Sequence, residues 1–210
     1  MVLYLHGFAS SPAGRKVKLL RERMEPADYR IAVPDLNVPS FEQLDFEAMV
    51  EAALRQTAVS PPDVIVGSSL GALVALEVSR RGVGAPLVLI APALGFGARW
   101  TDKLPEKPML TFFHHGAGEQ RPIRRAFFER MAIRDAADQP PASRVTVIMG
   151  RKDESVPFEQ VEGVWCRWVA SKALPAGSRF VEIPDGDHGL VDHVDQIAEE
   201  IRTSAEVHPS

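Results

Sequence analysis

Cysteine is almost absent from this sequence, because Cys166 is the one example among 210 residues. A single cysteine excludes an intramolecular disulfide and suits a reducing compartment. The residues around it, 164–169, are typical of a packed helix, and this predicts that the thiol is buried and structural.

Long hydrophobic runs and excess charge are lacking as well. No run approaches the roughly 18 apolar residues that cross a bilayer, and no basic leader precedes an apolar stretch of signal-peptide length. We therefore expect a cytoplasmic protein with no membrane partner. The formal net charge is −4, so the overall charge does not favour nucleic acid as a partner. Nothing in the sequence indicates the oligomeric state.

The composition that remains is that of an ordinary globular chain, with 45% hydrophobic and 25% charged residues. Its length suits one domain with a sizeable core, and we expect residues 1–210 to form it. Short apolar segments alternate with helical patterns, which predicts the α/β class: a minimal, mostly parallel sheet of about six strands with helices on both faces. The expected strands are 2–5, 30–33, 63–66, 86–91, 145–149 and 179–183.

Capping signals predict where several helices begin. Ser11 followed by Pro12 is expected to start a first helix that ends near Glu25. Ser40 and Gln43 have the pattern of a capping box, so a second helix is expected directly after them. Later helices are expected at about 157–171 and 191–203.

About fifty residues, 95–143, interrupt the alternation of strands and helices. Within them, 109–115 alternate in polarity up to Gly116-Ala117-Gly118, which predicts a hairpin, and 122–134 have helical spacing. A connection of this length is unusual inside a compact sheet. We interpret it as a small lid insertion over the carboxyl ends of the strands, where open α/β sheets bind ligands.

The segment 64–71 carries the strongest chemical signal. An apolar, β-branched run ends in Gly67-Ser68-Ser69-Leu70-Gly71, and an apolar helical pattern begins at once. Gly-x-Ser-x-Gly between a strand and a helix is the pattern of a nucleophile elbow, in which a strained turn exposes the serine and the glycines let the backbone pass closely. Ser69 is therefore the candidate nucleophile. The pentapeptide alone is modest support, so a base and an acid must be sought at other strand ends.

A base and an acid follow at two later strand ends. His188, in the loop 185–189 after the last strand, is placed to reach the elbow and accept its proton. Asp153, in the loop after the fifth strand, is the expected acid that orients this histidine, and Glu154 is its near competitor. The order Ser69, Asp153, His188 is that of hydrolases built on a nucleophile elbow.

An acyl-transfer site also needs hydrogen-bond donors for the oxyanion, each worth roughly 3 kcal/mol in known cases. The elbow offers the backbone N–H of Leu70. The turn His6-Gly7-Phe8 after the first strand offers the N–H of Phe8. Taken alone, this second segment would be interpreted as an ordinary turn.

Two alternatives stay open for the insertion. Trp100, Phe112, Phe113 and Phe127, together with His6, could line an acyl pocket, or the aromatic residues could form the insertion's own small core. Its arginines could attract an anionic acyl carrier such as a coenzyme A thioester, or form a solvated helix face with the acidic residues between them. These arginines are Arg121, Arg124, Arg125, Arg130 and Arg134.

Taken together, the motifs resemble the small YqiA/YcfP-type esterases of the α/β-hydrolase superfamily. The resemblance rests on four segments: Leu3 to Phe8 with Ser10-Ser11-Pro12 and Lys16, Val66 to Gly71, Gly150 to Pro157, and Gly186-Asp187-His188. It implies the α/β-hydrolase fold without the first strands of larger members, and a serine carboxylesterase or thioesterase that acts on short acyl chains without a cofactor. By this resemblance the nucleophile, acid and base fall on Ser69, Asp153 and His188.

The resulting prediction is a serine hydrolase that cleaves small to medium acyl esters or thioesters through an acyl-enzyme. The alternative is a hydrolase-like protein that binds a ligand at the same site with little or no turnover. Dehalogenase chemistry is disfavoured, because it needs a carboxylate in place of Ser69. A metal enzyme built on His114 and His115 is disfavoured as well, because adjacent residues on a strand point to opposite faces. We therefore expect no metal and no cofactor.

Overall fold

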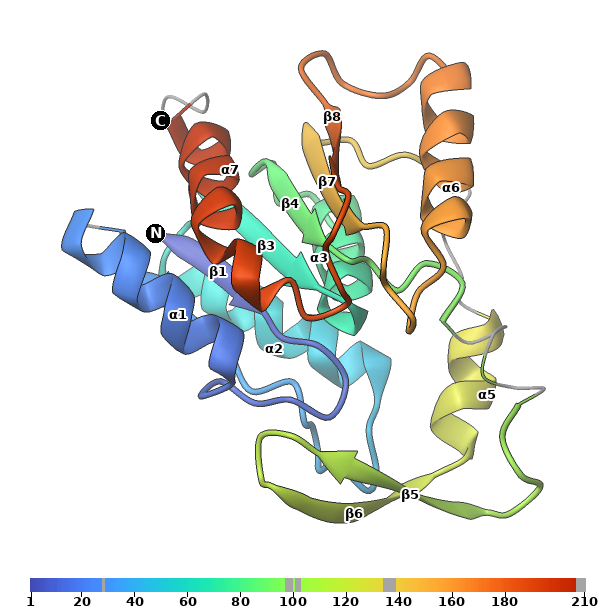
Figure 1. Ribbon diagram of the computed structural model, residues 1–210. Helices are drawn as coiled ribbons and strands as arrows, with labels where there is room; N and C mark the ends of the chain where they lie inside the picture. The colour runs from blue at the N-terminus through green and yellow to red at the C-terminus, as the bar shows by residue number, and fades with distance from the viewer. Residues whose placement is uncertain (28, 97–99, 101–102, 134–138, 207–210) are drawn as a thin grey trace.

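Six parallel strands form one sheet with helices on both faces in the computed structural model (Figure 1). The structure describes residues 1–27, 29–96, 100, 103–133 and 139–206. Every neighbouring pair of strands in the sheet is parallel. The expected strands all form, with ends shifted by at most two residues. Their order across the sheet is β2 (Ile31–Ala32), β1 (Val2–Leu5), β3 (Val64–Ser68), β4 (Leu87–Ile90), β7 (Val145–Gly150) and β8 (Arg179–Ile183).

Helices cover the sheet on both sides (Figure 1). Helices α1 (Arg15–Met24) and α7 (Val194–Glu206) lie together on one face. Helices α2 (Phe46–Val59) and α3 (Leu70–Arg80) lie together on the opposite face, and α6 (Phe158–Ala170) packs beside β7. Two short 3-10 turns, η1 (Glu25–Ala27) and η2 (Val191–His193), adjoin α1 and α7.

The core lies between the sheet and these helices. Strands β1, β3, β4 and β7 are buried along their whole length, as parallel strands covered on both faces must be. In α7, buried residues recur every three or four positions and form the apolar stripe that faces the sheet. They include Val194, Ile197, Ala198 and Ile201. Within the described part of the chain, no helix is long and apolar enough to cross a lipid bilayer.

Two helices begin later than the sequence predicts. α1 begins after Gly14 and not at Pro12, because the Ser11 carbonyl accepts the Gly14 N–H at 3.0 Å in a separate turn. In the insertion, α5 (Ala126–Ile133) begins after β6 has ended, because Ile123 pairs with Leu110 in the hairpin. The expected cap at Ser11 and the helical assignment of residues 122–125 are therefore wrong.

The start of α2 and the burial of the cysteine also differ from expectation. Ser40 Oγ accepts the Gln43 N–H at 3.3 Å, but this pair closes a turn ahead of the helix. Asp45 caps α2 instead, because its carboxylate accepts the Ala48 N–H at 3.0 Å. Cys166 is exposed, because other residues of α6 form its buried face. The expectation of a buried thiol is wrong.

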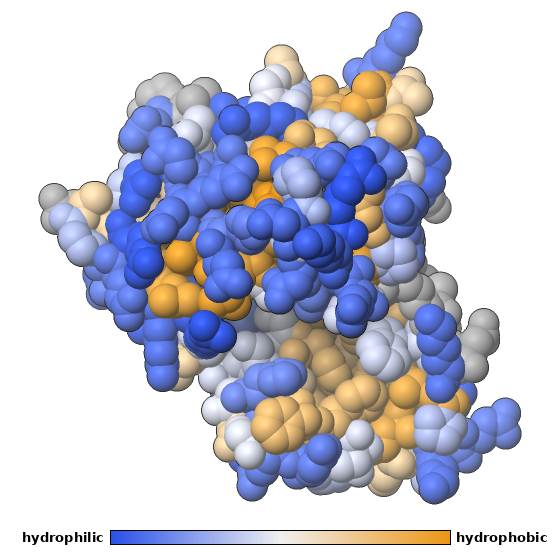
Figure 2. All heavy atoms as spheres, in the orientation of Figure 1, coloured by the Kyte–Doolittle hydropathy of each residue, from blue (hydrophilic) through white to orange (hydrophobic). Residues whose placement is uncertain are grey.

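The insertion lies beyond the carboxyl ends of the strands (Figure 1). Its hairpin forms as predicted, with β5 (Met109–His114) and β6 (Glu119–Arg124) paired antiparallel. Figure 2 shows a hollow between this insertion and the rest of the molecule, with hydrophobic atoms along it. Residues 97–99, 101–102 and 134–138, with Arg134 among them, lie outside the described residues. The buried side chains of the insertion include Leu110, Ile123, Phe127, Phe128 and Met131.

Candidate active site

The turn from β3 into α3 has the strained geometry of a nucleophile elbow. Ser69 has a φ of 54° and a ψ of −116°, a conformation that L residues rarely adopt. Only glycine fits at the two flanking positions, because a Cβ at either one would collide with backbone atoms. A Cβ on Gly67 would lie 2.5 Å from Ala72 Cα, and a Cβ on Gly71 would lie 2.1 Å from the Leu5 carbonyl oxygen. The glycines therefore let the turn pack against the end of β1 with the serine partly exposed at its tip.

A line of hydrogen bonds joins the three residues that the sequence singles out. Ser69 Oγ lies 3.1 Å from His188 Nε2, and Asp153 Oδ2 lies 2.7 Å from His188 Nδ1. The Asp153 side chain is fully buried, and its Oδ1 accepts the N–H groups of Ser155 and Val156 at 2.8 and 2.7 Å. With its carboxylate oriented in this way, Nδ1 of the imidazole donates and Nε2 is left to accept the serine proton.

The loops that carry the acid and the histidine meet through two glycines. A Cβ on Gly150 would lie 2.3 Å from the Gly186 carbonyl oxygen, so the backbones touch at this point. The Lys152 N–H also donates to that carbonyl at 2.9 Å. Asp187 closes the histidine loop, because its Oδ1 accepts the Leu190 N–H at 2.7 Å. Gly150 at the end of β7 and Gly186 in the loop after β8 were the available signal for this contact, and sequence reasoning missed it.

Two backbone N–H groups close to the elbow are the candidate oxyanion donors. The Leu70 amide is the first of α3, where the helix end carries partial positive charge. The Phe8 amide follows Gly7, at which an added Cβ would lie 3.2 Å from Ser69 Cβ. Among the hydrogen bonds of the described residues, none uses either amide. Both amides therefore remain candidates to bind a ligand oxygen.

A pocket of about 200 Å³ opens beside Ser69 and His188. Trp100, Phe112 and Phe113 contribute to its lining, as one of the two sequence alternatives expected. His115 and Ser155 add polar groups to the same wall. The remaining lining residues are Phe8, Ala9, Ala93, Phe96 and Val156. The pocket is thus mainly aromatic and apolar, with the hydroxyl of the elbow at its base.

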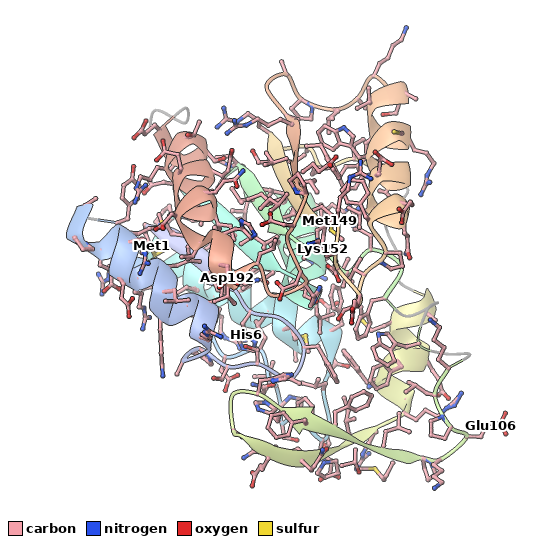
Figure 3. The ribbon with its side chains drawn as sticks, viewed as in Figure 1. Met1, His6, Glu106, Met149, Lys152 and Asp192 are labelled. Carbon is pink, nitrogen blue, oxygen red and sulfur yellow. The ribbon has the colours of Figure 1, made fainter. Side chains whose placement is uncertain are left out.

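Two residues expected in this pocket lie elsewhere. Phe127 is 1% exposed and packs in the core of the insertion, so the alternative of a small core holds for this residue. His6 is also buried (labelled in Figure 3) and takes part in the turn after β1. Its Nε2 accepts the Leu36 N–H at 3.0 Å, and its Nδ1 lies 3.0 Å from the Gly7 carbonyl oxygen. Neither residue lines the pocket.

Phe8 joins the turn after β1 to the insertion, which the sequence did not indicate. Its backbone amide is a candidate oxyanion donor, but its ring lies among five other aromatic rings. The ring centroid is 5.2 Å from that of Phe112 and 5.7 Å from that of Phe128. The other three partners are Phe41, Phe96 and Phe127. The side chain of this residue therefore belongs to the core that supports the pocket.

Among the residues that the structure describes, no charged side chain of Lys, Arg, Asp or Glu from the insertion lines the pocket. Arg121 pairs with Glu119 at 2.8 Å, and Arg130 donates to the Leu44 carbonyl at 3.3 Å. A larger hollow of about 780 Å³ is lined by residues of both signs, and neither Ser69, Asp153 nor His188 lines it. Glu106, one of its lining residues, points away from the sheet (Figure 3). The pocket beside Ser69 and His188 is therefore the better candidate for an active site.

The two histidines of the hairpin do not form a pair. His114 is buried, and its Nε2 lies 3.3 Å from Asn37 Oδ1, whereas His115 is exposed at the pocket. Within the described ranges, no three or more histidine, cysteine, aspartate or glutamate residues are grouped as a metal site would require. The side chains gathered at the elbow are instead those of a serine, a histidine and an aspartate.

One cation lies beneath the elbow. Lys16, in the first turn of α1, donates from Nζ to Ser68 Oγ at 3.0 Å, and the Ser68 side chain also hydrogen-bonds Tyr4. Burial lowers the pKa of the Lys16 ammonium to about 8, against the opposing effect of Asp187 and Asp153. Sequence reasoning noted this lysine among the motif residues but assigned it no role.

Residues 1–199 match the family described as "Uncharacterised protein family (UPF0227)". The chain belongs to this family. The match confirms the resemblance to the YqiA/YcfP-type proteins that the motifs predicted. Among curated proteins, none matches the sequence.

Solved structures with the same fold are distant in sequence. A protein from Agrobacterium vitis S4 has a TM-score of 0.79 at 20% identity, over 97% of this chain and 87% of the other. Alpha/beta hydrolase domain-containing protein 10 from mouse has a TM-score of 0.76 at 19% identity, over 96% and 88%. Est1E from Butyrivibrio proteoclasticus, with bound ferulic acid, has a TM-score of 0.70 at 14% identity, over 96% and 89%. The fold of this chain is therefore the α/β-hydrolase fold.

Proposed function

We propose that this protein is a serine carboxylesterase that cleaves small to medium acyl esters or thioesters. The observation that carries the proposal is the line of hydrogen bonds from Asp153 through His188 to Ser69, at 2.7 and 3.1 Å, beside an apolar pocket. A serine hydroxyl is a weak nucleophile until a base removes its proton. This arrangement supplies both the base and the carboxylate that orients it.

In the proposed first half-reaction, Ser69 Oγ attacks the carbonyl carbon of the ester while His188 Nε2 takes the hydroxyl proton. The carbonyl oxygen becomes an oxyanion, and the N–H groups of Phe8 and Leu70 donate to it. Such fixed donors stabilise the charge as it develops and need no reorganisation. His188 then gives the proton to the leaving alcohol or thiol, and the acyl group stays on Ser69.

In the proposed second half-reaction, a water molecule repeats the attack on the acyl-enzyme. His188 takes a proton from the water, the tetrahedral intermediate forms at the same donors, and the acid leaves as Ser69 recovers its proton. Asp153 stays ionised throughout and stabilises the imidazolium that forms twice in the cycle. No step needs a cofactor.

The size of the pocket supports a small acyl or aryl group. At about 200 Å³ it is smaller than the roughly 300–1,000 Å³ of sites for drug-sized ligands. Its aromatic walls favour an uncharged group next to the carbonyl. The ferulic acid bound to Est1E, which shares the fold, is consistent with an aromatic acid fitting such a site.

The test is covalent labelling combined with ester turnover. The protein is incubated with a fluorophosphonate probe and assayed on p-nitrophenyl esters of increasing chain length, and a thioester series is run beside them. We expect the wild type to be labelled and to hydrolyse short esters best. Ser69→Ala should lose labelling and several orders of magnitude in kcat.

Ser68→Ala is the matched control, because it removes the neighbouring hydroxyl and leaves Ser69 in place. It should still be labelled, since Ser68 bonds Lys16 and does not line the pocket. Labelling that survives Ser69→Ala would contradict the proposal. A wild-type protein that binds esters but turns over none of them would instead indicate a ligand-binding member of the fold.

A further inference from the structure

Asn37 joins three segments that lie around the proposed oxyanion donor at Phe8. Its Nδ2 donates to the Ser10 carbonyl oxygen at 2.9 Å and to Asp35 Oδ1 at 2.8 Å. Its Oδ1 lies 3.3 Å from His114 Nε2, on the hairpin of the insertion. One half-buried side chain therefore connects the loop after β1, the loop after β2 and the hairpin.

These contacts leave one orientation for the Asn37 amide. The Ala117 N–H donates to His114 Nδ1 at 3.0 Å, so Nε2 of this histidine carries the proton and donates to the Asn37 oxygen. Asp35 Oδ1 also accepts the Asn37 backbone N–H at 2.9 Å, and an ionised carboxylate can only accept. The nitrogen of the Asn37 amide therefore points to Asp35 and to the Ser10 carbonyl, which both need a donor.

The loop after β1 is strained directly beside Phe8. Ala9 has a φ of 54°, which is rare for a residue other than glycine. A backbone in this region persists only where the surrounding structure holds it. Before the strained residue, the Gly7 carbonyl oxygen lies 3.0 Å from His6 Nδ1, and after it the Ser10 carbonyl accepts from the asparagine. The N–H of Phe8 therefore lies between two carbonyls that are each held by a side chain.

The physical consequence concerns the direction of the Phe8 N–H. An oxyanion donor contributes when it is fixed, before the reaction, at hydrogen-bond distance from the place where the charge develops. A misplacement of about 1 Å can cost about 100-fold in rate. Rotation of the backbone at Ala9 would carry the Phe8 amide with it. The hydrogen bond from Asn37 to the Ser10 carbonyl opposes that rotation.

We propose that Asn37 is a positioning residue of the proposed esterase site, which fixes the N–H of Phe8 for the oxyanion by holding the Ser10 carbonyl. This inference rests on the proposed function. Asn37 is not among the residues that line the pocket beside Ser69, so it acts through the loop and not through contact with the substrate.

The hairpin offers a rival explanation for the same side chain. His114 lies between Phe113 and His115 in the sequence, and both of these neighbours line the pocket. At the turn of the hairpin, an added Cβ on Gly116 would lie 2.5 Å from Ser11 Cβ, so the hairpin also packs against the loop after β1. A side chain that only held the pocket wall would affect substrate binding, and therefore KM, more than the chemical step.

Two variants of Asn37 separate these explanations. Asn37→Leu keeps the approximate volume and removes every hydrogen bond of the side chain. Asn37→Asp keeps an oxygen for His114 Nε2 but loses the donor to the Ser10 carbonyl. Ser40→Ala is the matched control, because it removes a hydrogen bond of an exposed side chain from the same loop, where Ser40 Oγ accepts the Gln43 N–H.

The readouts are kcat and KM on the best p-nitrophenyl ester and the Ki of a short-chain alkyl trifluoromethyl ketone. In the expected adduct, Ser69 Oγ bonds to the ketone carbon, its proton passes to His188, and the carbonyl oxygen becomes an oxyanion. The adduct resembles the transition state, so its Ki depends on the oxyanion donors. KM reports on binding in the pocket when chemistry is slow relative to dissociation.

We expect kcat to fall by about 10- to 100-fold in both Asn37 variants, with KM within about threefold of the wild type. The Ki of the ketone should rise by a similar factor, because the adduct and the transition state need the same donors. Ser40→Ala should match the wild type in all three measurements.

Three results would overturn the proposal. The first is wild-type kcat and Ki in Asn37→Asp, which is the result that the rival explanation predicts. The second is a rise in KM at constant kcat in Asn37→Leu. The third is a loss of kcat confined to Asn37→Asp, because the added negative charge would then explain it.

The outcome is separable from that of the proposed function. If the wild type labels at Ser69 and hydrolyses esters but neither Asn37 variant loses kcat, only the role of Asn37 fails. If the wild type neither labels nor turns over any ester, the proposed function fails and this inference fails with it. Urea unfolding checks that each variant is folded, and Asn37→Ala takes the place of Asn37→Leu should the leucine variant not fold.

Discussion

Asp153 Oδ2 lies 2.7 Å from His188 Nδ1, while the other oxygen of the same carboxylate accepts two backbone N–H groups. Because those amides need an acceptor, an asparagine at this position would keep its oxygen toward them and turn its NH2 toward the imidazole. The imidazole would then present an N–H to Ser69 and could not accept its proton. We expect Asp153→Asn to lower kcat by about 10³- to 10⁴-fold with little change in KM, measured on a short p-nitrophenyl ester.

Glu154→Gln is the control for this prediction, because Glu154 is the adjacent carboxylate and is exposed. It should retain kcat within about twofold, as for surface substitutions away from a site. A larger loss in Glu154→Gln than in Asp153→Asn would reverse the assignment of the acid.

The close contact at Gly71 predicts a second effect. An added Cβ would lie 2.1 Å from the Leu5 carbonyl oxygen and 2.7 Å from that of His6, and both are backbone atoms. We expect Gly71→Ala to lower the free energy of unfolding by about 3 kcal/mol and to reduce labelling of Ser69, because β1 and the oxyanion loop must shift. Gly84→Ala, where an added Cβ meets nothing within 4 Å, should change stability by less than about 0.5 kcal/mol. Equal denaturation midpoints for the two variants would refute this reasoning.

Burial lowers the pKa of the Lys16 ammonium, so we expect that removing this charge stabilises the protein and that the gain depends on pH. Its pKa is about 8 in the folded protein and 10.5 ordinarily, so the full penalty of burying the charge is present below pH 8. Between these two values the unfolded chain binds a proton that the folded chain has released, and wild-type stability rises with pH. Lys16→Met should be more stable than the wild type by roughly 2 kcal/mol at pH 7, and the difference should shrink toward pH 10.5.

Urea unfolding at several pH values checks this expectation. Lys18→Met should show no comparable difference, because Lys18 is exposed. A Lys16→Met protein that is less stable than the wild type at pH 7 would show that the ammonium contributes more through its bond to Ser68 than its burial costs.

The pocket walls predict a change in chain-length preference. Phe112 lines the pocket, whereas Phe127 is 1% exposed in the core behind it. Phe112→Ala should raise kcat/KM for octanoyl relative to butyryl esters by about tenfold, because space opens beside the acyl chain. Phe127→Ala should instead lower the free energy of unfolding by about 3–5 kcal/mol. An unchanged preference in Phe112→Ala would place the acyl group elsewhere.

The sequence was most informative where a local pattern is typical of one structure only, as for buried parallel strands and the glycine-flanked elbow. Continuous apolar segments predicted the strands of a parallel sheet, and the elbow at Ser69 formed between β3 and α3 as expected. The sequence also placed Asp153 and His188 on loops after strands, and the structure brings both within hydrogen-bond distance of their partners.

Other expectations failed because a local pattern does not show what packs against it. Ser40 and Gln43 bond as a capping box would, but the helix begins after Asp45. Cys166 lies on the exposed side of an amphipathic helix whose orientation is set by its partners. The contact of Gly150 with Gly186 joins residues that are distant in sequence, and it could be found only in the folded chain.

The position of Phe8 couples the pocket walls to the proposed oxyanion donors, so that a change in one affects the other. Its amide is a candidate donor to the oxyanion, and its ring is packed among Phe41 and four aromatic residues of the insertion. An insertion transplanted from another hydrolase would repack that ring and shift the amide with it. Lid exchange by design would therefore have to treat the first loop and the insertion as one exchangeable module.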